Sequence, residues 1–428
     1  MDIRTMKHDR RSFIRTGGVS LAFTGLVPAF IQSCIRGGTE TSILEDMTRD
    51  VVPLTEQDYK DRQEKVQSLM AERLMDALWI EGGTNLEYFF DVGWRTSERV
   101  FGVVLPVAGD PVWICPGFEA PRAAELIRFG NDIRTWEEHE SPFTLLKDVF
   151  RSMTTPVKRL AIGPDVRNFV VEGIRKETGL GLLDGSGIIN RCRGIKTEKE
   201  LSYMDLANRI TKKAYQWAFA QVSPGMISRE LRDLISAGHA AQGTTGDGWP
   251  LFGPLSAFPH GSRQEYHLRE GDVILVDGGC TVEGYRSDVT RTIVFGRPND
   301  KHRKVFDMVK RAQDAAMATV RPGIPAGEVD RAARKVIEDA GYGPGYAYFV
   351  HRLGHGIGLD WHEWPYLVKD NPLPLEPGMT MSNEPGVYIY GEFGLRIEDC
   401  FVVTEDGSRY LGGMLCESLE NPFGSNVG

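Results

Sequence analysis

The chain is poor in the features that mark nucleic-acid-binding or disulfide-stabilised proteins. Its 50 Lys and Arg residues are outnumbered by 59 Asp and Glu residues, which gives a formal net charge of −9. Binding to nucleic-acid phosphates needs a basic surface, so this balance argues against nucleic acid as a partner. The six cysteines in 428 residues form no C-x-x-C pair, and their spacing does not demand a disulfide framework.

Long hydrophobic runs are lacking as well. The apolar stretch at residues 17–31 is too short and too rich in glycine to span a membrane stably. No internal repeat or low-complexity tract is apparent. What remains is an ordinary globular composition, 41% hydrophobic and 25% charged, in a chain long enough for two domains.

Residues 1–34 are predicted to be a targeting segment. The pair Arg10-Arg11, followed by Ser-Phe-Ile-Arg, resembles a twin-arginine signal. The tetrapeptide Ile31-Gln32-Ser33-Cys34 resembles a lipoprotein box, although its glutamine fits imperfectly, and lipidation would make Cys34 the anchored N-terminus. A simple cleaved signal or an uncleaved anchor is the alternative. We expect export by the twin-arginine route to a periplasmic or membrane-tethered location, with the polar residues 35–55 as a linker.

Residues 56–193 are predicted to form an α/β domain without a cluster of chemistry-bearing side chains. Helices are expected at residues 57–75, 116–129 and 142–153, and strands at 77–80, 101–106, 111–115 and 159–163. Residues 194–428 are predicted to form a second domain that begins with a long helix at 196–221. Thr197 and Glu200 match the S/T-x-x-E capping box at its start.

The second domain is organised around the segment at residues 273–295. Its first four residues are Val, Ile, Leu and Val, which is typical of a buried strand, and this strand leads directly into Asp277. Another β-rich run carries Asp288. Burying two carboxylates close together is costly, and a pair of metal ions offsets the charge better than Arg286 or Arg291, which lie at odd offsets from the two acids. Alternatively, Asp277 is a turn residue and Asp288 a solvated strand residue.

Three histidines, His351, His355 and His362, lie within one short segment. The H-x-x-x-H spacing of the first two occurs on metal-binding helices. Glycines at positions 354, 356 and 358 argue against a helix, and Arg352 stands where a zincin has its glutamate. An extended, glycine-rich loop that crosses a metal site is therefore the better interpretation.

Two further carboxylates follow. Pro385 biases Glu384 towards an extended conformation, and Glu398 lies in residues 394–403, which are predicted to form one strand. Cys280 and Cys400 lie near these acids in the sequence, but inert packing is a better interpretation for both than a ligand role.

With these residues in place, the chain resembles the pita-bread metallopeptidases, which include aminopeptidase P, prolidase, methionine aminopeptidase and the metal-free creatinases. The resemblance covers about residues 59–411 and is strongest to the prolidase and aminopeptidase P branch. The positions of the family's dinuclear metal set occur in order: Asp277, Asp288, His355, Glu384 and Glu398. The non-ligand histidines of the active site also match, at His260, His351 and His362.

The resemblance implies a creatinase-like N-terminal α/β domain followed by a pita-bread metallopeptidase domain. It implies two divalent ions, and an oxygen-rich ligand set suits Mn²⁺ best, with Co²⁺ or Zn²⁺ possible. Two ions ~3.5–4 Å apart can share one water molecule and lower its pKa towards neutrality. By resemblance, Asp277 binds one ion, His355 and Glu384 bind the other, and Asp288 and Glu398 bridge them.

By the same resemblance, Glu384 takes the proton of the shared water, and His260, His351 and His362 contact the substrate. Arg396 orients Glu398 or another acid that is its partner. The expected substrate is a peptide or dipeptide with proline at the second position, and the expected assembly is a homodimer. Two other functions remain open: lyase or amidohydrolase chemistry on a small metabolite at the same site, and a non-catalytic exported binding lipoprotein.

Overall fold

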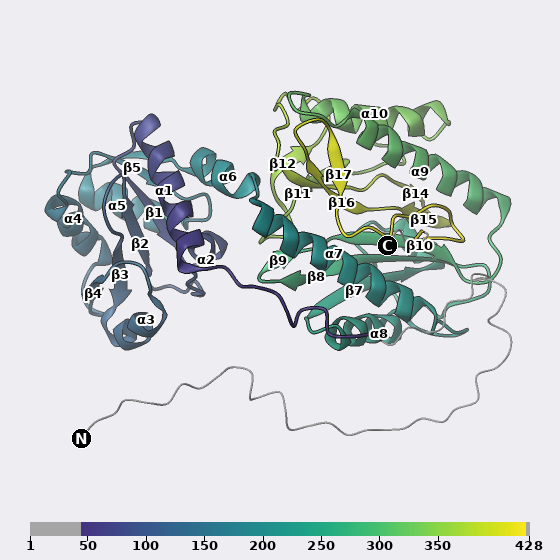
Figure 1. Ribbon diagram of the computed structural model, residues 1–428, viewed down its shortest axis with the longest axis horizontal. Helices are drawn as coiled ribbons and strands as arrows, with labels where there is room; N and C mark the ends of the chain where they lie inside the picture. The colour runs from purple at the N-terminus through teal and green to yellow at the C-terminus, as the bar shows by residue number, and fades with distance from the viewer. Residues whose placement is uncertain (1–43, 425–428) are drawn as a thin grey trace, which may run out of the picture. The chain divides into compact units, whose positions relative to one another are not determined.

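The computed structural model describes residues 44–424 (Figure 1). Its N-terminal part is built on a six-stranded mixed sheet with strand order β4-β3-β2-β1-β5-β6. The strands are β1 (Ala77–Glu81), β2 (Gly102–Pro106), β3 (Val112–Pro116), β4 (Asp132–Trp136), β5 (Arg159–Ile162) and β6 (Gly181–Asp184). β1 pairs antiparallel with β2 and parallel with β5. β2, β3 and β4 therefore extend the sheet on one side of β1, and β5 and β6 extend it on the other.

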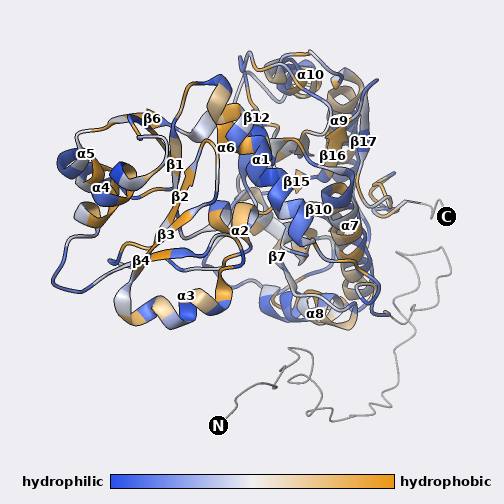
Figure 2. Ribbon diagram, turned by 60° about the vertical axis from the view of Figure 1, so that its left-hand side comes forward, coloured by the Kyte–Doolittle hydropathy of each residue, from blue (hydrophilic) through white to orange (hydrophobic). Residues whose placement is uncertain are grey.

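Helices cover both faces of this sheet because its strands are apolar on both sides. The helices are α1 (Glu56–Glu72), α2 (Thr84–Phe90), η1 (Gly117–Glu119), α3 (Ala120–Leu126), α4 (Pro142–Ser152), α5 (Asn168–Thr178) and α6 (Ser186–Gly194). Leu78 and Ile80 pack with α1, α2 and α6, whereas Ala77 and Trp79 pack with α4 and α5. This alternation follows from the two-residue period of a strand. Figure 2 shows hydrophobic residues along the strands and a largely hydrophilic α1.

The C-terminal part contains three further sheets. Its strands are β7 (Gly246–Phe252), β8 (Val273–Val282), β9 (Tyr285–Arg286), β10 (Val289–Val294), β11 (Gly354–Gly356), β12 (Glu363–Leu367), β13 (Thr380–Asn383), β14 (Gly386–Ile389), β15 (Phe393–Arg396), β16 (Asp399–Val403) and β17 (Ser408–Tyr410). One sheet has the order β10-β8-β7, with β9 paired to β8. A second has the order β12-β11-β13-β16-β17, and β14 and β15 form a hairpin.

Two pairs of helices cover these sheets (Figure 1). The helical elements are α7 (Glu198–Phe219), α8 (Ser228–Ala241), η2 (Gly253–Ala257), α9 (Asp300–Thr319) and α10 (Ala326–Asp339). Side chains of α7 and α8 share a core with Ile274 and Val276 of β8. Side chains of α9 and α10 share a core with Met381 of β13 and Phe401 of β16. The four helices therefore bury one face of each large sheet and leave the opposite faces to the site described below.

Several sequence-based predictions of local structure are confirmed. The segment at 273–295 forms the buried antiparallel pair β8 and β10. Thr197 is the N-cap of α7, and its side chain and that of Glu200 form the predicted capping box. The prediction of one strand at 394–403 is wrong, because β15 and β16 are separated at Ile397 and Glu398.

The segment predicted as a linker is described from residue 44 onward. There the Met47 amide donates to the Gln242 carbonyl at 3.1 Å, and the Tyr203 hydroxyl donates to the Val52 carbonyl at 2.6 Å. Five cysteines within residues 44–424 are buried free thiols. None of the helices in this range combines the length and apolarity needed to cross a bilayer. The predicted signal and Cys34 lie outside the described residues.

Candidate metal centre

Pairing of β10 with β8 and with the residue before β16 brings two predicted ligands, Asp277 and Glu398, close together. In the β8–β10 ladder Thr290 lies opposite Asp277, and Thr290 also forms a bridge with Glu398. Directly opposed residues on antiparallel strands present their side chains to the same face. Thr290 Oγ1 consequently lies 3.1 Å from Asp277 Oδ1 and 2.6 Å from Glu398 Oε2, and it accepts a hydrogen bond from Arg396 Nε at 2.9 Å. Asp288 immediately precedes β10, on the same ribbon as Thr290.

The other two predicted ligands come from the second large sheet. His355 lies on the short strand β11, as expected for an extended rather than a helical segment, and its amide donates to Ser382 Oγ at 3.0 Å. Ser382 Oγ in turn donates to Glu384 Oε1 at 3.1 Å. Gly354 permits this close approach, because a Cβ there would lie 2.0 Å from the Ser382 carbonyl oxygen.

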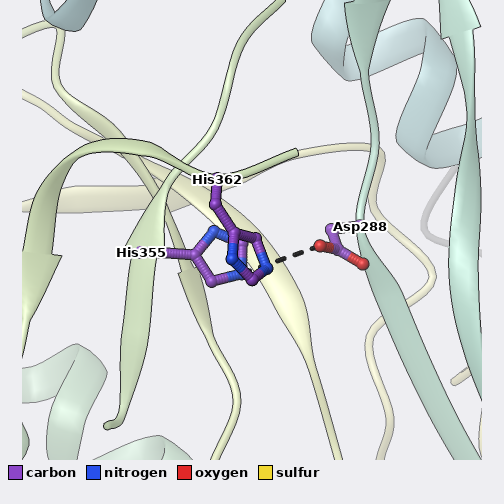
Figure 3. Close-up of side chains that lie close together, drawn as sticks. All are labelled: Asp288, His355 and His362. Carbon is purple, nitrogen blue, oxygen red and sulfur yellow. Dashed lines mark ion pairs between the residues drawn. The ribbon is translucent and has the colours of Figure 1, made fainter. Parts of the chain in front are cut away.

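The His355 ring is oriented by the backbone. Its Nδ1 lies 3.1 Å from the Gly356 carbonyl oxygen, and this contact fixes the ring so that Nε2 faces the acids. Nε2 lies 3.3 Å from Glu384 Oε1 and 3.7 Å from Asp288 Oδ2. Figure 3 shows the overlapping rings of His355 and His362 beside Asp288; the ring centroids are 3.8 Å apart.

All five predicted ligands belong to overlapping groups whose ligand atoms lie within 4.8 Å of one another. The groups are Asp277, Asp288 and Glu398; His355, Glu384 and Glu398; and Asp288, His355 and His362. Asp288, His355 and Glu398 each belong to two groups. Asp288 and Glu398 are therefore the carboxylates that would be shared if two neighbouring ions were held here.

The acids carry more negative charge than the nearby protein cations offset. Arg396 Nη2 lies 2.6 Å from Asp277 Oδ2. Burial and the neighbouring Asp277 raise the pKa of Asp288 well above its ordinary value, and burial and Asp288 do the same to the pKa of Glu398. Burial opposes ionisation of Glu384 too, but its hydrogen bond to His355 brings its pKa below the ordinary value. Four acids, of which Asp288 and Glu398 are buried, and one buried imidazole thus fit a pair of divalent cations.

Arg291 is not one of these counter-charges. It points to the other side of β10, where Nη2 lies 2.8 Å from Asp399 Oδ1 and Nη1 donates to the Glu398 carbonyl at 2.8 Å. Lys212 Nζ lies 2.7 Å from the same carboxylate, and all three side chains are buried. This ionic cluster holds the Glu398 carbonyl and the Asp399 side chain, behind the candidate metal centre.

The three non-ligand histidines occupy different positions. His351 Nε2 lies 2.8 Å from the Tyr388 hydroxyl, and its Nδ1 lies 4.0 Å from Glu384 Oε2. His362 is exposed and belongs to the group with Asp288 and His355. Burial lowers the pKa of His351 to about 4. The His362 side chain is exposed in part, and partial desolvation together with the adjacent His355 ring lowers its pKa to about 4 as well. His260 is exposed and belongs to none of the three groups found within residues 44–424.

Sequence reasoning missed three polar residues that hold this site together. Thr290 links two ligands to Arg396, Ser382 links His355 to Glu384, and the Tyr388 hydroxyl accepts a hydrogen bond from Arg396 Nη1 at 2.9 Å. Only the role of Thr290 could have been suspected from the sequence, because the two-residue period of a strand places Thr290 on the same face as Asp288. The partners of Ser382 and Tyr388 are defined by packing between strands that are distant in the sequence.

Comparison with known proteins agrees with this geometry. The family described as metallopeptidase family M24 matches residues 202–405, and the creatinase/prolidase N-terminal domain matches residues 62–195. The chain is 32% identical over 353 residues to an Xaa-Pro dipeptidase of Lactobacillus delbrueckii subsp. lactis, covering 81% of this chain and 95% of that protein. It is 32% identical over 410 residues to an uncharacterized peptidase of Schizosaccharomyces pombe, covering 90% and 89% of the two chains.

Solved structures show the same relationship. Dipeptidase PepE from Mycobacterium ulcerans superposes with a TM-score of 0.78 at 32% identity, over 84% of this chain and 96% of that one. A prolidase from Thermococcus sibiricus superposes with a TM-score of 0.74 at 31% identity, over 83% and 97% of the two chains. Two successive domain matches, full-length relatives and a ligand set suited to two divalent ions together show that this chain belongs to metallopeptidase family M24.

Proposed function

We propose that this enzyme is an exported, metal-dependent aminopeptidase or dipeptidase that hydrolyses the bond between an N-terminal residue and proline. The convergence of Asp277, Asp288, His355, Glu384 and Glu398 from two sheets is the observation that carries the proposal. The substrate class is supported by similarity to proteins named Xaa-Pro dipeptidase and prolidase. Mn²⁺ is the proposed native metal, with Co²⁺ or Zn²⁺ as alternatives, because the donors are mainly carboxylate oxygens.

The mechanism assigns a task to each side chain. Two divalent ions, when held by the five ligands, supply an activated water molecule and a Lewis acid. Glu384 accepts the proton of that water; its low pKa keeps the carboxylate ionised at neutral pH. His362 is neutral near pH 7 and donates to the oxygen of the scissile carbonyl as negative charge develops there, an interaction typically worth ~3–4 kcal/mol.

Two histidines position the substrate in this mechanism. His351 is held between the Tyr388 hydroxyl and the Arg352 carbonyl, so its ring has a fixed orientation next to Glu384. His260 is exposed and free to approach the substrate as it binds. Arg396 holds Asp277 and, through Thr290, Glu398.

A release assay on purified protein tests the function. Xaa-Pro dipeptides, Xaa-Pro-Pro peptides and matched Xaa-Ala peptides are incubated with protein loaded with Mn²⁺, Co²⁺ or Zn²⁺. We expect N-terminal residue release from the proline peptides and little from the alanine ones. If folded, metal-loaded protein leaves every Xaa-Pro peptide intact, lyase or amidohydrolase chemistry on a small metabolite replaces this proposal. Fewer than one bound ion per folded chain would instead favour a non-catalytic binding lipoprotein.

The proposed location and assembly have separate tests. Export by the twin-arginine route predicts that replacing Arg10 and Arg11 by lysine keeps the protein in the cytoplasm, as fractionation would detect. A lipid anchor predicts that Cys34→Ser moves the exported protein from the membrane to the soluble periplasmic fraction. A homodimer predicts twice the mass of one chain in light scattering after size-exclusion chromatography.

A further inference from the structure

One arginine next to the predicted ligand Asp288 contacts the loop that carries His362. Arg286 is the last residue of β9, and its amide donates to the Gly358 carbonyl at 2.8 Å. Its side-chain Nε donates to the Leu359 carbonyl, also at 2.8 Å. Arg286 therefore holds two consecutive peptide groups of the loop, shortly before His362.

The same side chain stacks on an aromatic ring of this loop. The Arg286 guanidinium carbon lies 5.1 Å from the centroid of the Trp361 ring, and Trp361 immediately precedes His362. A guanidinium group is planar, so it can donate a hydrogen bond at its edge while its face stacks on a ring. The hydrogen bond to Leu359 and the stack on Trp361 together restrict the backbone that leads into His362.

Strand alternation places Arg286 on the side of the metal centre. The intervening Ser287 points the other way, and its hydroxyl lies 2.8 Å from Thr211 Oγ1 of α7. The side chains before and after Ser287 project away from α7, because side chains alternate along an extended segment. These are the side chains of Arg286 and Asp288. The segment that supplies a predicted bridging carboxylate thus also supplies the arginine that holds the His362 loop.

The His362 ring has little support of its own. It is exposed, and its centroid lies 3.8 Å from that of the His355 ring (Figure 3). Among residues 44–424, no hydrogen bond or ion pair holds the His362 ring. Its place over the metal centre consequently depends on the backbone that carries it. Displacing a group that acts on the reacting atoms by about 1 Å can cost about 10²-fold in rate.

Resting on the proposed function, we propose that Arg286 is a positioning residue for His362. By holding Leu359 and Trp361, it keeps the His362 ring where the oxygen of the scissile carbonyl gains negative charge. Arg286 acts through His362 and not on the substrate. Its contribution therefore enters kcat rather than KM, because the charge that His362 stabilises develops only in the transition state.

The test is a double-mutant cycle between Arg286 and His362, measured as Xaa-Pro peptide release at saturating Mn²⁺. Arg286→Met keeps a long side chain and removes both the donor and the planar cation. We expect it to lower kcat about 10–100-fold and to leave KM nearly unchanged. In a His362→Ala background the same change should have no further effect, because the ring that Arg286 positions is gone.

The structure supplies a reason for the variant to fold and a matched control. Arg193 Nη2 still holds the loop, at 2.7 Å from Asp360 Oδ2 and 2.5 Å from Glu363 Oε2. Arg269→Met should keep wild-type kcat, because Arg269 stacks on an aromatic ring outside this loop, with 5.3 Å from its guanidinium carbon to the Tyr266 centroid. Arg286→Lys retains a donor but has no planar face, so it should recover part of the loss.

Hydrogen–deuterium exchange of metal-free protein measures the same contact without turnover. We expect Arg286→Met to speed exchange of the amides at residues 358–362 and to leave the amides of α10 unchanged. Unchanged exchange in the loop, wild-type kcat in Arg286→Met, or an equal loss of kcat with and without His362 would each overturn the inference while leaving Xaa-Pro hydrolysis intact. If the wild type cleaves no Xaa-Pro peptide, the proposed function fails, and the role of Arg286 in catalysis fails with it.

Discussion

Thr290 Oγ1 lies 2.6 Å from Glu398 Oε2, and the two residues also form a backbone bridge between segments more than a hundred positions apart. The same hydroxyl lies 3.1 Å from Asp277 Oδ1. One uncharged side chain therefore contacts two of the acids that face the metal positions. Loss of a group that orients metal ligands in this way typically costs about 10–100-fold in metal affinity or activity.

We expect Thr290→Val, which keeps the shape of the side chain and removes the hydroxyl, to weaken metal binding and lower kcat by about 10–100-fold. Metal titration and peptide-release kinetics measure the two effects. Thr319→Val is the control, because the Thr319 hydroxyl donates only within α9, to the Ala315 carbonyl at 2.8 Å. Wild-type metal affinity and kcat in Thr290→Val would show that Thr290 does not orient the ligands.

Replacing Glu384 removes both a ligand and the proposed proton acceptor. Glu384→Ala should lower kcat by at least 10²–10⁴-fold, the range for loss of a general base. The fold should persist, because the change also removes one of several mutually repelling buried charges. Circular dichroism checks the fold, and Glu392→Ala, at an exposed glutamate paired with Lys301, is the matched control. Near-normal turnover by Glu384→Ala would overturn the catalytic assignment.

Removing the metal should destabilise the protein. Without divalent ions the four carboxylates repel one another, whereas ions at 100 times their dissociation constant stabilise the fold by about 2.7 kcal/mol per site. We expect a chelator to lower the Tm by several degrees at pH 7.5 and Mn²⁺ to restore it. His355→Ala should show a smaller Mn²⁺-dependent shift. A Tm that is unchanged by the chelator and by added Mn²⁺ would contradict a dinuclear site.

Buried His239 should make stability depend on pH away from the metal centre. Burial lowers its pKa from 6.5 to about 4, so between these pH values the unfolded chain binds a proton that the folded chain does not. Stability contributed by the neutral ring is thus present above pH 6.5 and is lost as the pH falls towards 4, by up to ~3 kcal/mol.

Urea unfolding of chelator-treated protein between pH 4.5 and 7.5 measures this effect. His239→Gln should flatten the dependence in that window, whatever its effect on absolute stability. His139→Gln removes an exposed histidine and should keep the wild-type slope. Identical slopes in all three proteins would assign the dependence to other groups.

The sequence alone determined the chemical types in the site and much of the local structure. Capping residues, strand propensity and glycine are local signals, so α7, β8, β10 and the extended segment around His355 were predictable. The order and spacing of the acids and histidines were enough to suggest two divalent ions. The separation of β15 from β16 at Glu398 was not predictable, because a bridge to a distant strand produces it.

Only the tertiary structure decided which of these groups meet. Strand register placed Thr290 between Asp277 and Glu398 and turned Arg291 away towards Asp399. Register and burial arise from packing between segments far apart in the chain, and no local pattern of residues contains that information.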